Sequence, residues 1–350
     1  MMQDAMWLPI VNCPFSIINY QLSIVLFMNS RTWQLLRLMA DGEFHSGTAL
    51  GRQLGISRAT VCNALATVAD SGVLLQRIRG RGYRLNGGWD RLDNVAIERH
   101  LGAAAARFQI DILQQAASSN TELLRRAAQG LPSGGVLAVE LQTAGRGRIG
   151  RAWHSGLGNA LTFSLLWRLD CGLNALSGLS LAVGVAIFRA LQKYNAVGVG
   201  LKWPNDIQTP QGKLGGVLIE AQGDMYGPSA VVIGIGINCS LPLMIEQAIT
   251  QPAAALDQVC AIPPTRNQLL AALLQELAQV MDEFARTGFA SFRTEWEQCH
   301  VQQDLPIRLQ MPDGAMISGV ARGVSEIGEL RLETAEGVRQ FNSGEVGDRS

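Results

Sequence analysis

A short segment rich in glycine and arginine, residues 145–151, limits the folds that this chain can adopt, because it lies between two apolar stretches typical of β-strands, 135–140 and 161–169. It holds three glycines and three arginines in seven residues. Glycine allows the backbone to come close to a ligand, and guanidinium groups pair well with phosphate and carboxylate oxygens. The pattern predicts a structured loop that binds an anion.

The same spacing has two other interpretations. Gly145, Gly147 and Gly150 fit the dinucleotide-binding fingerprint, and Asp170 follows Gly150 at a suitable distance. That fingerprint needs a helix after the third glycine, whereas residues 151–160 contain two more glycines and lead into a strand-like run. A Walker A pattern is absent, and Arg-Gly segments that bind nucleic acid by charge are usually repetitive, which this one is not. The context therefore favours a phosphate-binding loop.

Lysine is rare in this chain and gathers in one segment. The 29 basic residues include lysine only at positions 193, 202 and 213. Two of these three belong to the stretch 202–220, which begins Lys202-Trp-Pro-Asn-Asp206 and continues with Lys213-Leu-Gly-Gly. An ammonium group is a compact point charge that suits a single developing negative charge, so the pattern indicates positions where arginine will not serve. Two surface lysines at random positions are the alternative.

Five motifs in a fixed order carry a resemblance to biotin-protein ligases. They are Ser118-Ser119-Asn120, the run from Gln142 to Arg148 with Arg151 and Trp153, residues 202–206, residues 213–216, and residues 234–238. The resemblance covers nearly everything from Met28 onward, because the N-terminal part is similar to the DNA-binding domain of bifunctional ligases that also repress the biotin operon. The chain departs from the family pattern at two positions: Ser119 replaces a threonine, and Ile149 replaces an arginine that some bifunctional members carry.

The composition indicates a multidomain protein with reduced thiols. The 350 residues are 47% hydrophobic with zero formal net charge, which predicts two to three domains and argues against a whole-molecule polyanion binder. Six scattered cysteines and four scattered histidines signal neither a disulfide framework nor a zinc site. We therefore expect a cytoplasmic protein. Residues 1–27 lack the features of a signal peptide or a membrane span, and we expect an extension that is disordered or not natively translated, with Met28 as the natural start.

Residues 28–88 are predicted to form a winged helix-turn-helix domain. Helices are expected at 32–39, 48–54 and 58–70, followed by a hairpin at 73–85 with arginines at its tip. This region has eight arginines against three acidic residues, a net charge of +5, which indicates contact with a phosphate backbone. A winged helix used only for packing is the alternative. The residues expected to contact DNA are Ser57, Arg58, Thr60, Asn63, Arg77, Arg79 and Arg81.

The rest of the chain is predicted to be α+β with a mixed or largely antiparallel sheet, because its strands and helices do not alternate as in a doubly wound fold. The resemblance implies that residues 89–302 form a catalytic domain similar to class II aminoacyl-tRNA synthetases. From residue 303 to 350, short strands separated by Pro and Gly turns predict a small barrel, and the resemblance implies an SH3-like domain.

The resemblance also implies a reaction: biotin and ATP, with Mg2+, form biotinoyl-5'-adenylate, and a lysine of the biotin carboxyl carrier protein of acetyl-CoA carboxylase then displaces AMP. Lys213, Arg148 and Asp206 are expected to be catalytic, although for Asp206 a role beside the metal, as a base, or as a turn cap all remain open. No resident metal site is expected. The residues expected to bind biotin or the adenylate are Ser118, Ser119, Asn120, Gln142, Gly145, Arg146, Gly147, Arg148, Arg151, Trp153, Lys202, Lys213, Gly216 and Asn238.

Two functions can coexist in such a chain. The first is the ligase, and the second is a repressor of biotin-synthesis genes that binds operator DNA as a homodimer when the adenylate is present. A monofunctional ligase with a non-regulatory winged helix is the alternative. A lipoate ligase is a third possibility, but the Arg-rich and His-Asp signatures of that family are absent. No membrane partner is expected.

Overall fold

The N-terminal part of the structure is a three-helix unit followed by a hairpin. The computed structural model describes residues 28–347 except 67, 69–72, 248 and 250, and its first elements are α1 (Ser30–Leu38), α2 (Gly47–Leu54), α3 (Arg58–Ala66), β1 (Leu75–Ile78) and β2 (Gly82–Leu85). Ser57 precedes α3, and its Oγ accepts a hydrogen bond from the Thr60 amide at 3.1 Å, as expected for a helix cap. The predicted helix-turn-helix and wing are confirmed, whereas the predicted extension 1–27 and the predicted end of the third helix lie outside the described residues.

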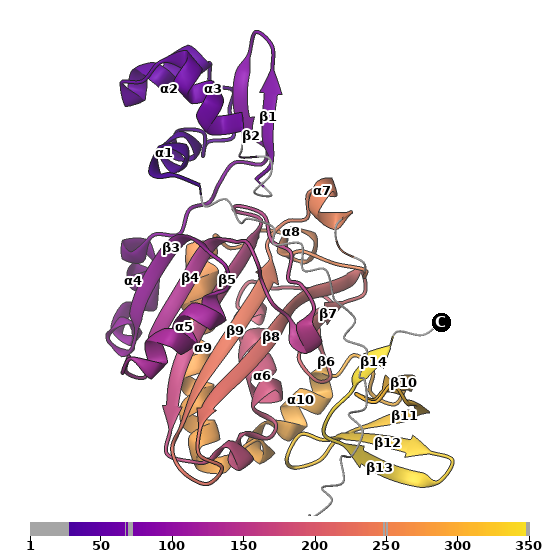
Figure 1. The fold of residues 1–350 in the computed structure, drawn as a ribbon. Helices are drawn as coiled ribbons and strands as arrows, with labels where there is room; N and C mark the ends of the chain where they lie inside the picture. Colours follow the sequence, from indigo (N-terminus) through magenta and orange to yellow (C-terminus); the bar gives the residue numbers. More distant parts are fainter. Residues whose placement is uncertain (1–27, 67, 69–72, 248, 250, 348–350) are drawn as a thin grey trace, which may run out of the picture.

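A seven-stranded mixed sheet forms the centre of the molecule (Figure 1). Only β3 and β4 run parallel, and every other neighbouring pair is antiparallel, so the predicted mixed sheet is confirmed. In spatial order the strands are β3 (Gln109–Ala116), β4 (Gly135–Gln142), β5 (Ala160–Leu169), β9 (Ser229–Asn238), β8 (Gly212–Gly223), β7 (Asp206–Thr209) and β6 (Gly200–Lys202).

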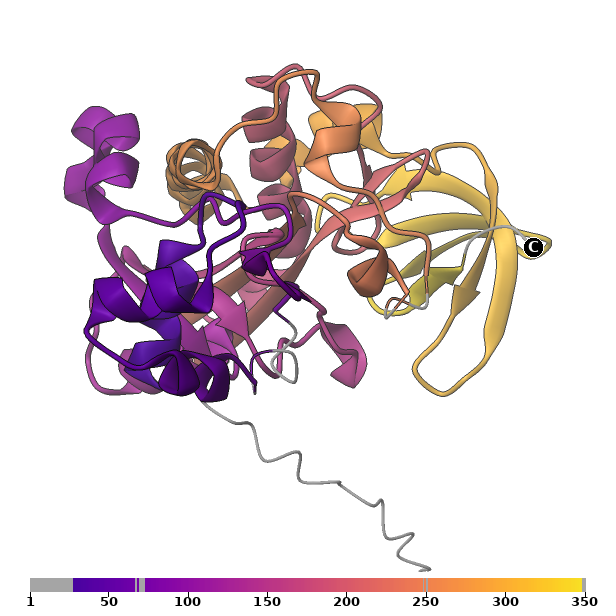
Figure 2. The same cartoon turned by 90° about the horizontal axis from the view of Figure 1, so that it is seen from above.

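Helices cover both faces of this sheet. The long helix α9 packs against α4 and α6 on one face, and α5 lies alone on the other (Figures 1 and 2). Two short helices precede α9, and α10 follows it. None of the helices in the described part of the chain is long and apolar enough to cross a lipid bilayer. The bounds are α4 (Asn94–Leu101), α5 (Ser119–Ala128), α6 (Leu179–Gln192), α7 (Leu243–Glu246), α8 (Leu256–Val259), α9 (Arg266–Thr287) and α10 (Arg293–Cys299).

The C-terminal part is a five-stranded antiparallel sheet beside the central domain (Figure 1). Its core is continuous with that of the central domain, because Ile307, Leu309 and Leu332 belong to the same buried cluster as α6 and α9. The strands are β10 (Pro306–Gln310), β11 (Met316–Val324), β12 (Leu330–Thr334), β13 (Gly337–Phe341) and β14 (Glu345–Gly347), and β14 pairs with β10. The predicted short strands of this region are confirmed.

The winged helix shares its hydrophobic core with the central domain. Its buried cluster includes Leu141 from the end of β4, Leu157 from the following loop, and Trp89 from the connecting segment. The rings of Trp33 and Trp89 lie with their centroids 5.8 Å apart. These contacts tie the N-terminal unit directly to the strand that leads into the glycine- and arginine-rich loop.

A buried ion pair reinforces this junction. Glu140 of β4 accepts hydrogen bonds from Trp89 Nε1 at 3.1 Å, from the Leu92 amide at 2.8 Å, and from Arg266 Nη1 at 2.5 Å. Side chains of both Glu140 and Arg266 are almost wholly buried, with 4% and 2% of their surface exposed. A buried carboxylate such as that of Glu140 needs hydrogen-bond donors and a cation around it, because an unpaired charge in the protein interior is strongly destabilising.

Candidate functional site

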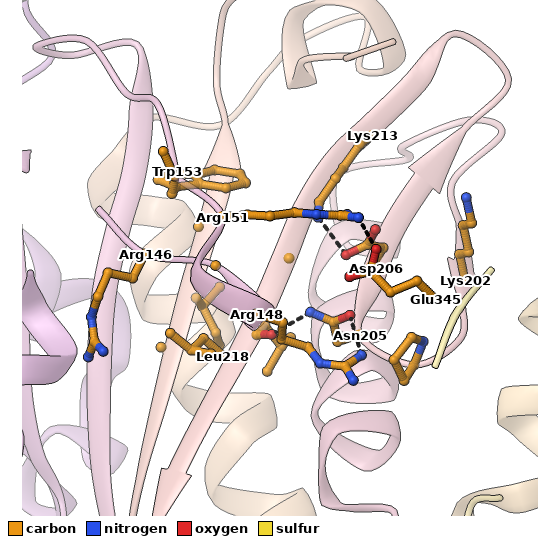
Figure 3. Close-up of a pocket in the computed structure, with 18 of the residues that line it drawn as sticks. Arg146, Arg148, Arg151, Trp153, Lys202, Asn205, Asp206, Lys213, Leu218 and Glu345 are labelled. Atoms are coloured by element: carbon orange, nitrogen blue, oxygen red, sulfur yellow. Dashed lines mark hydrogen bonds and ion pairs between the residues drawn. The ribbon is translucent and has the colours of Figure 1, made fainter. Parts of the chain in front are cut away.

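A cavity of about 320 Å³ lies where the loop after β4, the β7–β8 strands and the edge of the C-terminal sheet meet (Figure 3). Polar and cationic residues contribute much of its lining, which suits an anionic ligand. The cavity brings together residues from across 230 positions of the chain, including Ser118, Ser119, Asn120, Gln142, Arg146, Gly147, Arg148, Arg151, Trp153, Lys202, Asp206, Lys213, Gly216 and Glu345.

The glycine- and arginine-rich loop folds back on itself as a small hairpin. The Trp153 amide donates to the Gly145 carbonyl at 2.9 Å, and the Gly147 amide donates to the Arg151 carbonyl at 2.7 Å. At the tip, Ile149 has a φ of 52° and is 69% exposed. A left-handed conformation is unfavourable for a β-branched residue, so the tip is strained. No helix follows the third glycine, which confirms that the dinucleotide interpretation was correctly set aside.

All three loop arginines line the cavity. Arg148 is half-buried, and its Nη1 donates to Asn205 Oδ1 at 3.3 Å. Burial lowers the pKa of Arg148, and the neighbouring Asp206 carboxylate opposes that change. Arg151 forms an ion pair with Glu345 of β14. A partly desolvated guanidinium gains most from an anion placed beside it, so this corner of the cavity is prepared for phosphate or carboxylate oxygens.

Lys213 and Asp206 form the ion pair at the centre of the site (Figure 3). Lys213 Nζ lies 2.6 Å from Asp206 Oδ1, and each side chain is about four-fifths buried. Asp206 opens β7 opposite Gly216 of β8, and a Cβ atom at Gly216 would lie 3.3 Å from Lys213 Nζ. Glycine at this position therefore leaves room for the ammonium group and for any ligand atom that it contacts.

The Ser118–Asn120 segment supplies neutral polar groups to the cavity. The Ser119 amide donates to Gln142 Oε1 at 2.7 Å, and Ser164 Oγ lies 2.7 Å from Ser119 Oγ. Asn120 Nδ2 donates to the Leu218 carbonyl at 3.1 Å. The Asn120 Oδ1 atom accepts a hydrogen bond from Ser164 Oγ, so both the Nδ2 and the Oδ1 of this side chain have partners within the protein.

Two predicted residues, Asn238 and Gly145, shape the site without lining the cavity. Asn238 is buried and its Nδ2 donates to the carbonyls of Lys213 and Ala254, at 3.3 and 3.0 Å, so it fixes the backbone of the lysine. The Trp153 ring lies against Gly236, where a Cβ atom would come within 2.5 Å of it. Gly145 lies against the Trp153 carbonyl oxygen, from which a Cβ atom would be only 2.6 Å away.

Three residues of the site were not singled out from the sequence. Glu345 comes from the C-terminal sheet, Glu220 from β8 and Ser164 from β5. No sequence pattern gave any of the three a role in the site. Their positions depend on strand pairing and packing between distant segments, which no local pattern reports.

The winged helix presents an exposed polar and cationic face. The predicted DNA-contact residues Ser57, Arg58 and Asn63 are exposed on the α3 side. In the wing, Arg81 lies over the Phe44 ring at 4.1 Å and Arg77 over the Tyr83 ring at 5.7 Å, so aromatic rings support these cations. Arg79 at the tip is exposed. A cationic helix and wing of this kind suit a phosphate backbone.

Taken together, a mixed-sheet domain with an anion-binding loop and a central lysine, joined to a winged helix and a small β-domain, defines a nucleotide-using ligase with a DNA-binding module. Family models match all three parts: "HTH domain" over residues 31–84, "Biotin/lipoate A/B protein ligase family" over 113–238, and "Biotin protein ligase C terminal domain" over 306–346.

Similar proteins extend this match over nearly the whole chain. The chain is 36% identical to the bifunctional ligase/repressor BirA of Salmonella typhimurium, over 90% of this chain and 97% of the relative, and 35% identical to that of Escherichia coli, over 92% and 98%. Among solved structures, the biotin protein ligase of Aquifex aeolicus in complex with biotin and ATP is 28% identical, with a TM-score of 0.58 over 69% of this chain and 99% of that one. The chain belongs to the biotin protein ligase family.

Proposed function

We propose that this protein activates biotin with ATP to give biotinoyl-5'-adenylate, and then transfers biotin to a lysine of the biotin carboxyl carrier protein of acetyl-CoA carboxylase. One observation carries the proposal. The lining of one cavity combines the cations of Arg148, Arg151 and Lys213 with the neutral polar groups of Ser119 and Gln142. That combination suits a ligand that carries both a phosphate group and a ureido group.

In the first step, a biotin carboxylate oxygen attacks the α-phosphorus of ATP, and pyrophosphate leaves. Negative charge accumulates on oxygens around phosphorus, so a fixed cation stabilises the transition state more than the ground state. Lys213 would contact the carboxyl oxygen and the α-phosphate, and Arg148 and Arg151 would hold the phosphates. ATP enters as its Mg2+ complex, so the metal belongs to the substrate in this scheme.

In the second step, an acceptor lysine amine attacks the acyl carbon and AMP leaves. Asp206 is paired with Lys213 at 2.6 Å, which supports a role in holding the ammonium group in place. A base role toward the incoming amine is compatible with the same position. The turn-cap role has less support, because Asp206 is the first residue of β7.

In the same cavity, the biotin ureido ring would contact Ser118, Ser119 and Gln142. Ser118 and Ser119 are buried, so the polar groups that they offer to a ligand are few and fixed in position. Trp153 has a buried Nε1 without a partner among the described residues, which supports its packing against the adenylate. Lys202 lines the cavity beside Asp206.

The direct test is an incubation of the protein with biotin, Mg-ATP and a biotin carboxyl carrier domain. We expect covalent label on the acceptor lysine together with one pyrophosphate for each adenylate formed. An acceptor in which that lysine is replaced by arginine is the control. If no pyrophosphate is released, the ligase proposal fails.

We further propose that the protein represses biotin-synthesis genes, with the adenylate as corepressor and a homodimer as the DNA-binding form. The exposed cationic face of α3 and the wing favours this second function, as does the likeness to relatives named ligase/repressor. A gel-shift titration on DNA from upstream of biotin-synthesis genes should show a shift that depends on biotin and ATP. A monofunctional ligase would give no such dependence.

The proposed domains are a winged helix over residues 28–88, a ligase domain over 89–302 and a C-terminal domain over 303–350. We expect the protein to act in the cytoplasm, where ATP and reducing conditions coincide. The five described cysteines are all free, which agrees with reduced thiols.

A further inference from the structure

A chain of hydrogen bonds connects polar residues beside the cavity. It runs from Arg146 to Glu220, from Glu220 to Asn120, through Ser164 to Ser119, and from the Ser119 amide to Gln142. Gln142 is the last residue of β4 and Arg146 lies in the loop that follows, so both ends of the chain lie within five consecutive residues. The other members come from α5, β5 and β8.

Glu220 is the only carboxylate in this chain of contacts. Its Oε2 accepts from Asn120 Nδ2 at 2.9 Å, and both of its oxygens lie within 3.0 Å of Arg146 Nη2. The Glu220 side chain is 26% exposed and that of Arg146 is 44% exposed. A partly buried carboxylate needs a cation and donors nearby, so Glu220 holds both partners in a fixed geometry.

Arg146 therefore differs from the other loop arginines. Figure 3 shows its guanidinium directed away from the group formed by Arg148, Asp206 and Lys213. Its position is set by Glu220 across the sheet, whereas the Arg146 backbone forms a bridge with Ala152 in the loop hairpin. The side chain thus ties the first turn of the loop to β8, beside the flexible residues Gly145 and Gly147.

The opposite end of the chain is equally constrained. Gly234 lies under Asn120, and a Cβ atom there would meet Asn120 Oδ1 at 2.2 Å. Asn120 is hydrogen-bonded to Glu220 through Nδ2 and to Ser164 through Oδ1. A displacement of Glu220 would therefore also shift Ser119, which contacts Ser164. The loop and these polar residues are linked through one acidic residue.

We propose that Glu220 is a positioning residue that holds the loop closed over the adenylate while it aligns Asn120 and Ser119 at the biotin end. This inference rests on the proposed ligase function. An acyl-adenylate reacts with water and stray amines unless the site excludes them. Loss of the Glu220 charge frees Arg146, and the loop can then open around its glycines and release the intermediate before transfer.

The test compares Glu220→Gln with a matched substitution, Glu295→Gln. Glu295 also accepts two hydrogen bonds from one arginine, Arg189, and is 34% exposed, but it lies on α10 outside the cavity. The measured quantity is pyrophosphate released for each biotin transferred to the carrier, at saturating biotin, Mg-ATP and carrier domain. We expect about a fivefold rise for Glu220→Gln, a higher KM for biotin, and no change in the ratio for Glu295→Gln.

A second variant separates positioning from general stability. Arg146→Met removes the partner of Glu220 at a half-exposed side chain, so the fold should persist, and melting temperatures check this. We expect a rise in the ratio here too, and a double variant with a ratio no higher than that of Glu220→Gln alone, because both substitutions remove the contact between Arg146 and Glu220. An unchanged ratio in Glu220→Gln or Arg146→Met, or additive effects, overturns the inference. If the unmodified protein forms no adenylate, the proposed function fails instead.

Discussion

Arg151 of the cavity loop and Glu345 of β14 form an ion pair, although 194 positions separate them in the chain. The C-terminal sheet therefore supplies an acidic residue to the cavity, next to the loop arginine Arg151. Its Met316 and Val346 also line that cavity. The C-terminal part of the chain belongs to the site and does not merely cover it.

The first prediction concerns this pair. Glu345→Gln should weaken the use of Mg-ATP by less than about fivefold, because an ion pair with an arginine that is 62% exposed contributes roughly 1 kcal/mol or less. The measurement is the KM for Mg-ATP in pyrophosphate release. Glu336→Gln is the control, since Glu336 pairs with Arg339 on the same sheet at 3.6 Å and is 80% exposed. A loss near a hundredfold would indicate that Glu345 contacts the substrate itself.

Lys213 should be irreplaceable by arginine. A guanidinium is larger than an ammonium group, and Gly216 and Asp206 leave little room around Lys213 Nζ. Lys213→Arg and Lys213→Met should both lower kcat of adenylation by at least about a hundredfold. Stopped-flow detection of pyrophosphate measures this step alone. Lys193→Met is the control, because Lys193 pairs with Glu276 outside the cavity, and full activity of Lys213→Arg would refute the argument.

The buried pair of Glu140 and Arg266 should show an asymmetric effect on stability. Glu140→Ala leaves the buried Arg266 without its carboxylate, and we expect a loss of about 3–5 kcal/mol in the free energy of unfolding. Arg266→Met should cost less, because Glu140 keeps the donors of Trp89 and Leu92. Urea denaturation of both variants at pH 7 shows which substitution lowers the free energy of unfolding more. Equal losses would mean that the remaining donors contribute nothing.

Stability should fall in mild acid because of His300. Burial lowers the pKa of His300 to about 4, although Gln303, Glu297 and Asp304 act in the opposite direction. The unfolded chain takes up a proton below pH 6.5 and the folded chain only near pH 4, so stability is full above pH 6.5 and declines as pH falls toward 4, by about 3 kcal/mol.

His300→Phe should remove that decline while preserving the contact with Trp296, whose ring centroid lies 4.5 Å away. Urea denaturation between pH 4 and pH 7 measures the change. His100→Gln serves as the control, because His100 is exposed. An equal pH dependence in His300→Phe and the unmodified protein would show that other groups cause it.

The wing arginines should act through charge. Arg79→Ala should weaken binding to DNA from upstream of biotin-synthesis genes and reduce the slope of log K against log salt by about 1, since one phosphate contact is lost. Fluorescence anisotropy at several salt concentrations, with biotin and Mg-ATP present, gives the slope. Arg339→Ala on the C-terminal sheet should leave it unchanged. A similar drop in both variants would mean that DNA binding does not depend on the wing.

Elements with a regular hydrophobic pattern were predicted from the sequence, whereas short elements without such a pattern were missed. The regular apolar spacing over residues 268–286 predicts a long helix, and α9 spans Arg266–Thr287. The strand β7, only four residues long, was missed between the two lysines. Its existence depends on pairing with β8, which supplies the hydrogen bonds that the short segment cannot provide alone.

The candidate site was predictable where chemistry is local in sequence. The loop arginines and Lys213 were found because unusual residue types cluster there, whereas the Ser118–Asn120 segment was expected from the resemblance to biotin-protein ligases. The partner of each side chain was not predictable: Arg146 lines the cavity as expected of a ligand-binding residue, but its ion pair with Glu220 has no signal in the sequence. Glu220 and Glu345 are ordinary acidic residues in strands, and only tertiary packing gives them a place in the site.

The last three residues of β4 each serve a different neighbour: Glu140 pairs with α9, Leu141 completes the core of the winged helix, and Gln142 faces the cavity. An engineer who wished to shorten this chain to a compact biotinylation tool could not delete the DNA-reading module cleanly. Deletion of the winged helix would expose the apolar side chains of Leu141 and Leu157 to water. Leu141 is adjacent in sequence to Gln142, which lines the cavity, so a polar replacement surface would have to be designed at Leu141 and Leu157.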